Sequence, residues 1–253
     1  SNTLTRGGPL AQIPSGYQID LMVNSDSRKA VVLEGFFTTY IRPSEGQETS
    51  GELSLRWKPR SNISLSVGPQ YSVERSELQW VTRVKDPEMA STFGTRYIFG
   101  RIERQTLASE IRLNWIFTPR LSLQLYLQPF IAVGKYDKFK ELARPKTYEY
   151  NIYGDAPSTI DYADSVYSID PDGEGPAEAF SFYNPDFNVK SLRGTIVLRW
   201  EYLPGSLLYL VWTQDRADYA SAGDLRLGRD LRDLLTAPGD NIFLVKVSYR
   251  WNL

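Results

Sequence analysis

An acidic stretch at residues 170–174 is the best candidate for metal chemistry. Asp170, Asp172 and Glu174 alternate with Pro171 and Gly173. Carboxylate oxygens at alternate positions around glycine can wrap a hard cation, so this stretch is a candidate calcium site. However, Pro171 stiffens the segment, and the full loop pattern of an EF-hand is not met. An ordinary acidic turn is the competing interpretation, and no other cofactor is expected.

The sequence contains few of the side chains that enzymes usually employ in catalysis. It contains no cysteine and no histidine, which excludes thiol nucleophiles, cysteine zinc sites, Ser-His-Asp triads and the usual general base near neutral pH. Glu110 and Glu201 could be proposed as paired carboxylates for glycoside hydrolysis, but nothing in the sequence places them together. We therefore do not expect an enzyme.

A larger group of charged and amide side chains recurs at alternate positions in apolar segments. Such side chains could line an aqueous path and set its selectivity, or they could form ion pairs that fill a closed interior. The sequence leaves both interpretations open. The group consists of Arg56, Glu110, Arg112, Gln124, Gln128, Arg193, Arg199 and Glu201.

The side chains of this group would be positioned by β-strands. The alternation of apolar and polar residues along the sequence predicts such strands. Between residues 107 and 117, Leu107, Ile111 and Leu113 share one parity, whereas Glu110 and Arg112 share the other. Successive side chains of a strand point to opposite faces, so one face is apolar and the other is polar. The same unit recurs along the chain and predicts about nine or ten antiparallel strands, because residues 77–84 could form a strand of their own. The last predicted strand carries residues 243–253. One helix is expected near residues 225–235.

The connections between the predicted strands alternate in length. Short turns lie at Ser25, Pro59, Pro119 and Pro204, and longer connections span residues 42–51, 76–94, 134–186 and 216–240. Short turns on one side and long loops on the other are typical of outer-membrane β-barrels, in which the long loops are extracellular. Residues 134–186 are therefore expected to form a long extracellular loop.

Aromatic residues gather at the ends of the predicted strands, mostly near the short turns. Tyr and Trp favour the membrane–water interface, so we expect them to form aromatic girdles. The expected interface residues are Trp57, Trp115, Phe117, Trp200, Tyr202, Trp212, Tyr249 and Trp251.

Together these patterns predict an all-β fold, an antiparallel transmembrane β-barrel in the outer membrane of a Gram-negative bacterium. A soluble β-sandwich or soluble barrel is the alternative. Residues 1–253 are expected to be the C-terminal part of the barrel, because a count of nine strands is odd and the first strand begins on the outer side. Further strands are expected upstream.

Several stretches, in order along nearly the whole chain, resemble a known family. They include residues 5–10 (TRGGPL), 96–101 (RYIFGR), 117–119 (FTP), 121–126 (LSLQLY), 128–130 (QPF), 170–173 (DPDG), 184–188 (NPDFN), 198–202 (LRWEY), 211–214 (VWTQ) and 241–249 (NIFLVKVSY). Together they resemble the C-terminal barrel of domain-of-unknown-function family 5916. This resemblance implies a large outer-membrane protein, commonly with an N-terminal domain like carbohydrate-binding module family 9.

Three functions follow as expectations. The first is a pore or a transport or translocation component, and the second is a membrane anchor or assembly subunit for a carbohydrate-binding domain or partner proteins. The third is a soluble carbohydrate-binding β-protein. The expected partners are membrane lipid, other outer-membrane subunits or the upstream part of the same protein, and carbohydrate through a domain absent here. The net charge of −1 argues against nucleic acid.

Overall fold

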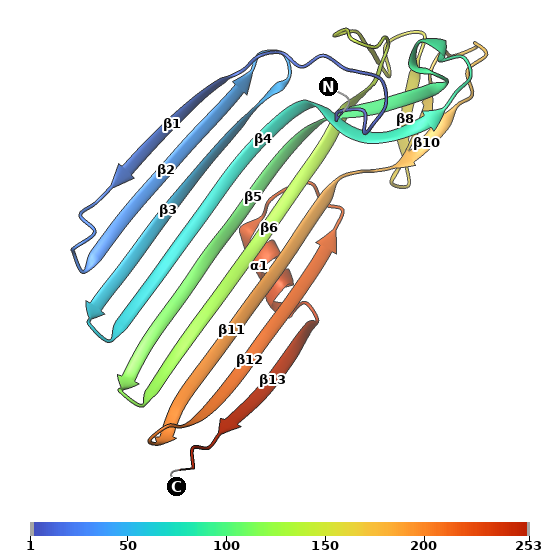
Figure 1. Ribbon diagram of the computed structural model, residues 1–253. Helices are drawn as coiled ribbons and strands as arrows, with labels where there is room; N and C mark the ends of the chain where they lie inside the picture. The colour runs from blue at the N-terminus through green and yellow to red at the C-terminus, as the bar shows by residue number, and fades with distance from the viewer. Residues whose placement is uncertain (1–2, 252–253) are drawn as a thin grey trace.

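The computed structural model describes residues 3–251, and a broad antiparallel sheet dominates it (Figure 1). Nine strands follow one another across this sheet in the order β1-β2-β3-β4-β5-β6-β11-β12-β13. Their bounds are β1 Tyr17–Asn24, β2 Val31–Arg42, β3 Gly46–Arg60, β4 Ile63–Lys85, β5 Thr95–Thr118, β6 Leu121–Leu142, β11 Phe187–Leu203, β12 Ser206–Ala220 and β13 Gly239–Ser248. The predicted all-β antiparallel fold is confirmed. Within residues 3–251, β1 and β13 are the edges and the sheet is open.

Smaller elements gather mainly at one end of the sheet, called here the upper end, where the long connections lie (Figure 1). Strand β7 (Tyr150–Ile152) pairs with β6, and a separate three-stranded sheet has the order β10-β9-β8. Its bounds are β8 Thr159–Ala163, β9 Val166–Asp170 and β10 Phe180–Tyr183. A 3-10 turn, η1, spans Ala90–Thr92, and a single α-helix, α1, spans Leu227–Thr236. Among the described residues, no helix is long and apolar enough to cross a membrane.

The upper parts of the long strands differ from the sequence prediction. Residues 76–94 were expected to be a connection or to contain a separate strand at residues 77–84. Instead, β4 continues to Lys85 as one strand and β5 begins at Thr95. The pairing of β4 with β5 shifts register after Ser76 and again after Trp80. Each such irregularity inserts an extra residue and reverses the alternation, which hides the strand from a search for period two.

Two further boundaries also differ from expectation. Residues 134–186 do connect β6 to β11, but β6 extends to Leu142 and the connection carries β7 to β10. The last strand ends at Ser248, so Tyr249 and Trp251 follow it rather than belong to it. The final residue, Leu253, lies outside the described residues.

Below the upper end, the sheet has one apolar face and one polar face. Directly paired residues of antiparallel strands lie on the same face, so each row of pairs can be followed across the sheet. One row carries Leu65, Leu113, Leu125 and Ile196. The adjacent row, on the opposite face, carries Arg56, Ser66, Arg112, Tyr126 and Thr195. In the described chain, no second sheet packs on either face of this lower part.

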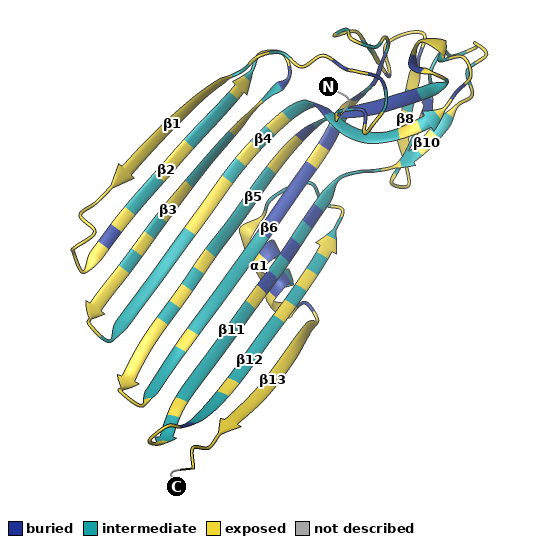
Figure 2. Ribbon diagram, in the orientation of Figure 1, coloured by how far each residue is buried: buried dark blue, intermediate teal, exposed yellow. Residues whose placement is uncertain are grey.

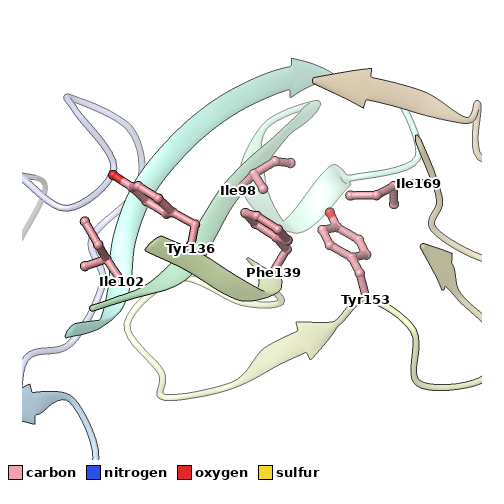
Figure 3. Packing of buried hydrophobic residues seen from close by; sticks show 6 residues of the cluster. All are labelled: Ile98, Ile102, Tyr136, Phe139, Tyr153 and Ile169. Atoms are coloured by element: carbon pink, nitrogen blue, oxygen red, sulfur yellow. The ribbon is translucent and has the colours of Figure 1, made fainter. Parts of the chain in front are cut away.

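Burial is concentrated at the upper end, whereas most of the sheet is half-buried or exposed (Figure 2). One cluster of buried residues joins the upper parts of β5 and β6 to the connection that follows (Figure 3). It contains Ile98, Ile102, Tyr136, Phe139, Tyr153 and Ile169. A second cluster contains Ala11, Leu78, Tyr97, Phe99 and Leu142, and it brings in the segment that precedes β1. The upper end therefore has its own hydrophobic core.

A buried ion-pair network fixes this upper core. The Arg96 guanidinium donates to the Asp86 carboxylate at 2.6 Å and to both oxygens of Glu141 at 2.6 and 2.7 Å. Tyr153 donates its hydroxyl to Glu141 at 2.9 Å, and Asn151 donates its amide at 3.0 Å. Burial, together with the neighbouring Glu141 carboxylate, raises the pKa of Tyr153, so its phenol remains a donor.

We expect Arg96→Leu to loosen the upper end, because it leaves two buried carboxylates without their cation. Losing one partner of a buried pair costs about 3–5 kcal/mol, and every 1.4 kcal/mol is about tenfold in an equilibrium. Limited proteolysis of residues 143–186 in the whole protein should therefore be about 100-fold faster or more. Arg28→Leu is the control, since Arg28 is exposed in its ion pair with Asp26. Equal cleavage of both variants would contradict a structural role for Arg96.

Candidate functional site

The polar face of the sheet carries all the residues expected to line an interior. Arg56, Arg112, Gln124, Gln128, Arg193 and Arg199 face the same side through the pairing of β3 to β6 and β11. Glu110 and Glu201 share this parity on β5 and β11. The structure does not bring Glu110 and Glu201 together, because β6 lies between their strands. The paired-carboxylate arrangement of a glycosidase is therefore not formed by these two residues.

Charges at the centre of the polar face are arranged in small local sets. Arg112 pairs with Glu110 at 3.0 Å, and both side chains are about half exposed. Tyr126 donates its hydroxyl to Glu110 at 3.3 Å, and the Arg112 guanidinium lies 5.1 Å from the centre of the Tyr126 ring. Exposed pairs of this kind contribute little to stability. They leave the surface hydrated and locally neutral.

The remaining charged residues of the polar face differ in their surroundings. Arg193 faces Asp215 at 3.4 Å, again with both side chains exposed. Glu201 instead accepts a hydrogen bond from the Gly205 backbone N–H at 2.8 Å and so closes the β11–β12 turn. Within residues 3–251, Arg56 and Arg199 form no ion pair. These two guanidinium groups are the uncompensated cations among the predicted lining residues.

A shallow hollow of about 240 Å³ opens on the polar face beside Glu110. It exists because the strands present small side chains there. Ser54, Ser66, Gly68 and Ala108 line it together with Glu52, Gln70 and Gln128. The sequence analysis did not identify this hollow. Its signal was present, however, as a run of serine and glycine at polar-face positions of β3 and β4.

The apolar face carries aromatic residues near the short turns, at the lower end of the sheet. The ring centres of Trp115 and Phe117 lie 4.3 Å apart, and those of Trp200 and Tyr202 lie 6.3 Å apart. Just after the end of β13, the rings of Tyr249 and Trp251 lie 5.3 Å apart. Trp57 occupies the corresponding place on β3 and is exposed. Side-chain packing thus pairs these aromatics along the lower edge.

A single row of paired residues connects the lower aromatics to the upper ones. The row starts at Trp57 on β3, passes through Leu113 on β5 and Ile196 on β11, and ends at Trp212 and Phe243. Trp212 and Phe243 stack with ring centres 6.1 Å apart. On β5 the row lies two residues above Trp115, and on β11 it lies four residues above Trp200. The lines of aromatics are therefore oblique to the rows of paired residues.

The apolar surface also ends obliquely at its upper side, where the same face becomes polar. On β3 the change occurs at Thr49, on β5 at Gln105, on β11 at Lys190, on β12 at Gln214 and on β13 at Asn241. Both boundaries of the apolar surface shift in the same direction across the sheet. We call the surface between them the apolar band.

The acidic stretch forms a hydrogen-bonded turn after β9. Asp170 accepts from the backbone N–H groups of Asp172 and Gly173 at 3.3 and 2.8 Å, and Asp172 accepts from that of Ala177 at 3.0 Å. In the described part of the chain, no three acidic side chains gather to hold a metal ion. The calcium site at Asp170, Asp172 and Glu174 stays a prediction without support from this geometry.

Comparison with known proteins gives one match. The family model described as a domain of unknown function, DUF5916, matches residues 5–251. No curated protein and no solved structure matches the chain. The family description assigns no activity, so the sheet and its two faces are the basis for inferring function. Since the match covers nearly all of the sequence, the chain belongs to the DUF5916 family.

Proposed function

We propose that this chain forms a wall of an outer-membrane β-barrel in a Gram-negative envelope. The apolar band contacts lipid, and the polar face lines an interior through which solutes or a polypeptide pass. The observation that carries this proposal is the oblique apolar band with an aromatic line along its lower boundary and Trp212 and Phe243 at its upper one. Such aromatic lines are typical of the two membrane interfaces of a barrel.

The slope of the lower aromatic line supports a tilted barrel wall. The row of paired residues that starts at Trp57 on β3 reaches Ile196 on β11. The aromatic residue on β11 is Trp200, so the aromatic line lies four residues below the row there. Those four residues accumulate over four strand-to-strand steps. With about 3.3 Å per residue and about 4.8 Å between strands, a level line requires a strand tilt of about 35°. Strands of membrane barrels tilt by about 35–45°.

The height of the band also suits a bilayer. On β5 the apolar positions run from Leu107 to Trp115, which is eight residue steps. At about 3.4 Å per residue this length is about 27 Å, and a tilt of about 35° reduces it to about 22 Å along the membrane normal. The apolar band of outer-membrane barrels is about 25 Å tall. A water-soluble protein rarely exposes a continuous apolar surface of this extent.

In a membrane, the two edge strands of the sheet need hydrogen-bonding partners. Unpaired backbone N–H and C=O groups are costly in hydrocarbon, so membrane β-structure must be closed. Strands β1 and β13, the edges of the described sheet, must therefore pair in the membrane. Their partners are each other, further strands of the same protein, or strands of an associated subunit.

A membrane anchor or assembly subunit is the second candidate function. The packed upper end favours it, since two hydrophobic clusters and the Arg96 network form a solid structure where external loops would lie. Such a structure could hold a carbohydrate-binding domain or partner proteins at the envelope. A continuous water-filled interior distinguishes the transport function from this alternative.

We expect Ile111→Arg to impair membrane assembly, because Ile111 is midway between Leu107 and Trp115 in the apolar band. An arginine facing lipid at the midplane costs about 2–4 kcal/mol. Gln124→Arg on the polar face is the matched control and should assemble normally. Heat-modifiability on gels and the amount recovered in outer membranes measure assembly of the whole protein. Equal tolerance of both variants would refute the assignment of faces.

The transport function predicts ionic conductance for the whole protein in planar bilayers. In that case Arg112→Glu should increase cation selectivity, since it places two carboxylates together on the polar face. Arg28→Glu, in the exposed β1–β2 turn, should change selectivity less. Reversal potentials in a salt gradient give the selectivity. A protein that assembles but never conducts would favour the anchor function.

A further inference from the structure

The helix α1 lies on the apolar face of the sheet, at the upper boundary of the apolar band. Its contacts are with β11 and β12, and Figure 1 shows it crossing one side of these strands. Asn188 of β11 donates its amide to Asp230 at 3.0 Å. Arg216 of β12 donates to the backbone carbonyls of Leu235 and Ala237 at the helix end. The helix therefore runs from β11 towards β12 across the strands.

A buried lysine of β11, Lys190, lies beside the helix. The Lys190 side chain is fully buried, and its ammonium pairs with Asp218 at 2.7 Å and with Asp233 of the helix at 3.7 Å. Asn188 and Asp230 are buried beside it. These polar groups lie directly above Leu192, the last apolar residue of the band on β11. Hydrogen bonds and ion pairs thus join the sheet to the helix where the band ends.

The helix has three distinct sides, since successive residues are about 100° apart around its axis. Asp230 and Leu234 are buried against the sheet. On one flank, Arg229 and Asp233 join the polar groups above the band. On the opposite flank, Leu227, Leu231 and Leu235 form a stripe one turn apart, and they are 50%, 43% and 61% exposed. We call these three residues the leucine flank.

The leucine flank faces the apolar band. A right-handed helix that runs from β11 to β12, with Asp230 against the sheet, turns the leucine flank towards the lower strand ends. The polar flank, with Arg229 bound to Asp224 at 3.0 Å, faces the upper end. Arg232 points away from both and forms no ion pair in the described chain. The helix is therefore apolar on its lower flank and charged on its upper flank, as is typical of a helix at a membrane interface.

We propose that α1 is an interfacial helix whose leucine flank enters the acyl chains of the surrounding lipid leaflet. This inference rests on the proposed membrane function. The leucine flank continues the apolar band outward from the sheet, so lipid that covers the band also covers the flank. Arg232 extends to the headgroup phosphates, as long cationic side chains do near an interface. The helix thereby fixes the level of the β12–β13 edge in the leaflet.

Spin labels at single cysteines test this inference, because the chain contains no cysteine of its own. Leu231→Cys probes the leucine flank, Arg232→Cys is the neighbouring control on the same helix, and Ile111→Cys probes the middle of the band. The whole protein is reconstituted into phosphatidylcholine vesicles, and collisions of each label with oxygen and with a water-soluble nickel complex are measured. The oxygen-to-nickel ratio rises with depth in the bilayer.

We expect the ratio to be highest at position 111, intermediate at 231 and several-fold lower at 232 than at 231. A lipid-like ratio at 111 with a water-like ratio at 231 overturns the inference but leaves the membrane function intact. Water-like ratios at both positions overturn the membrane function. A label at 231 that meets neither reagent indicates a protein partner over the flank and also overturns the inference. Leu227→Cys and Leu235→Cys repeat the test if Leu231→Cys fails to assemble.

Discussion

The antiparallel pairing register is the constraint on which the rest of this structure depends. Paired residues share a face, so one alternating strand imposes its polarity on its neighbour, and nine strands in succession produce two faces of opposite character. A slip of one residue between any two strands would bring arginines and glutamines into the apolar band. The register is therefore determined by side chains on both faces, even though no second sheet packs against them in the described chain.

The upper end of the sheet lacks the regular alternation of apolar and polar residues that the rest of the sheet has. There the alternation is interrupted by register shifts in β4, β5 and β6, and apolar residues on both faces are covered by other parts of the chain. Ile98 and Phe139 pack against the β7 to β10 connection, whereas Tyr97 and Phe99 pack against the segment before β1. This end provides its own core, while the apolar band below depends on its surroundings for coverage.

Sequence reasoning recovered what alternation encodes and missed what interrupts it. The nine long strands, their short turns and the polar face around Arg112 follow from period-two patterning, and the helix predicted at residues 225–235 corresponds to α1 at Leu227–Thr236. The continuation of β4 to Lys85 and the short strands β7 to β10 were missed, because bulges and three-to-five-residue strands leave no clear period. Lys190 and Arg96 are buried, and their ion-pair partners lie ten or more residues away in the sequence, so no local pattern identifies such pairs.

Lys190 shows how the boundary of the apolar band and the helix α1 depend on each other. Lys190 shares its face of β11 with Leu192, Gly194 and Ile196, so it would interrupt the apolar band if it were exposed. The carboxylates of Asp218 and of Asp233 in the helix instead neutralise it, and the Lys190 side chain is fully buried. A buried charge is tolerated only when it is paired in this way. The position of α1 therefore follows from where the band must end, and the leucine flank extends the apolar surface past the point at which the strands become polar.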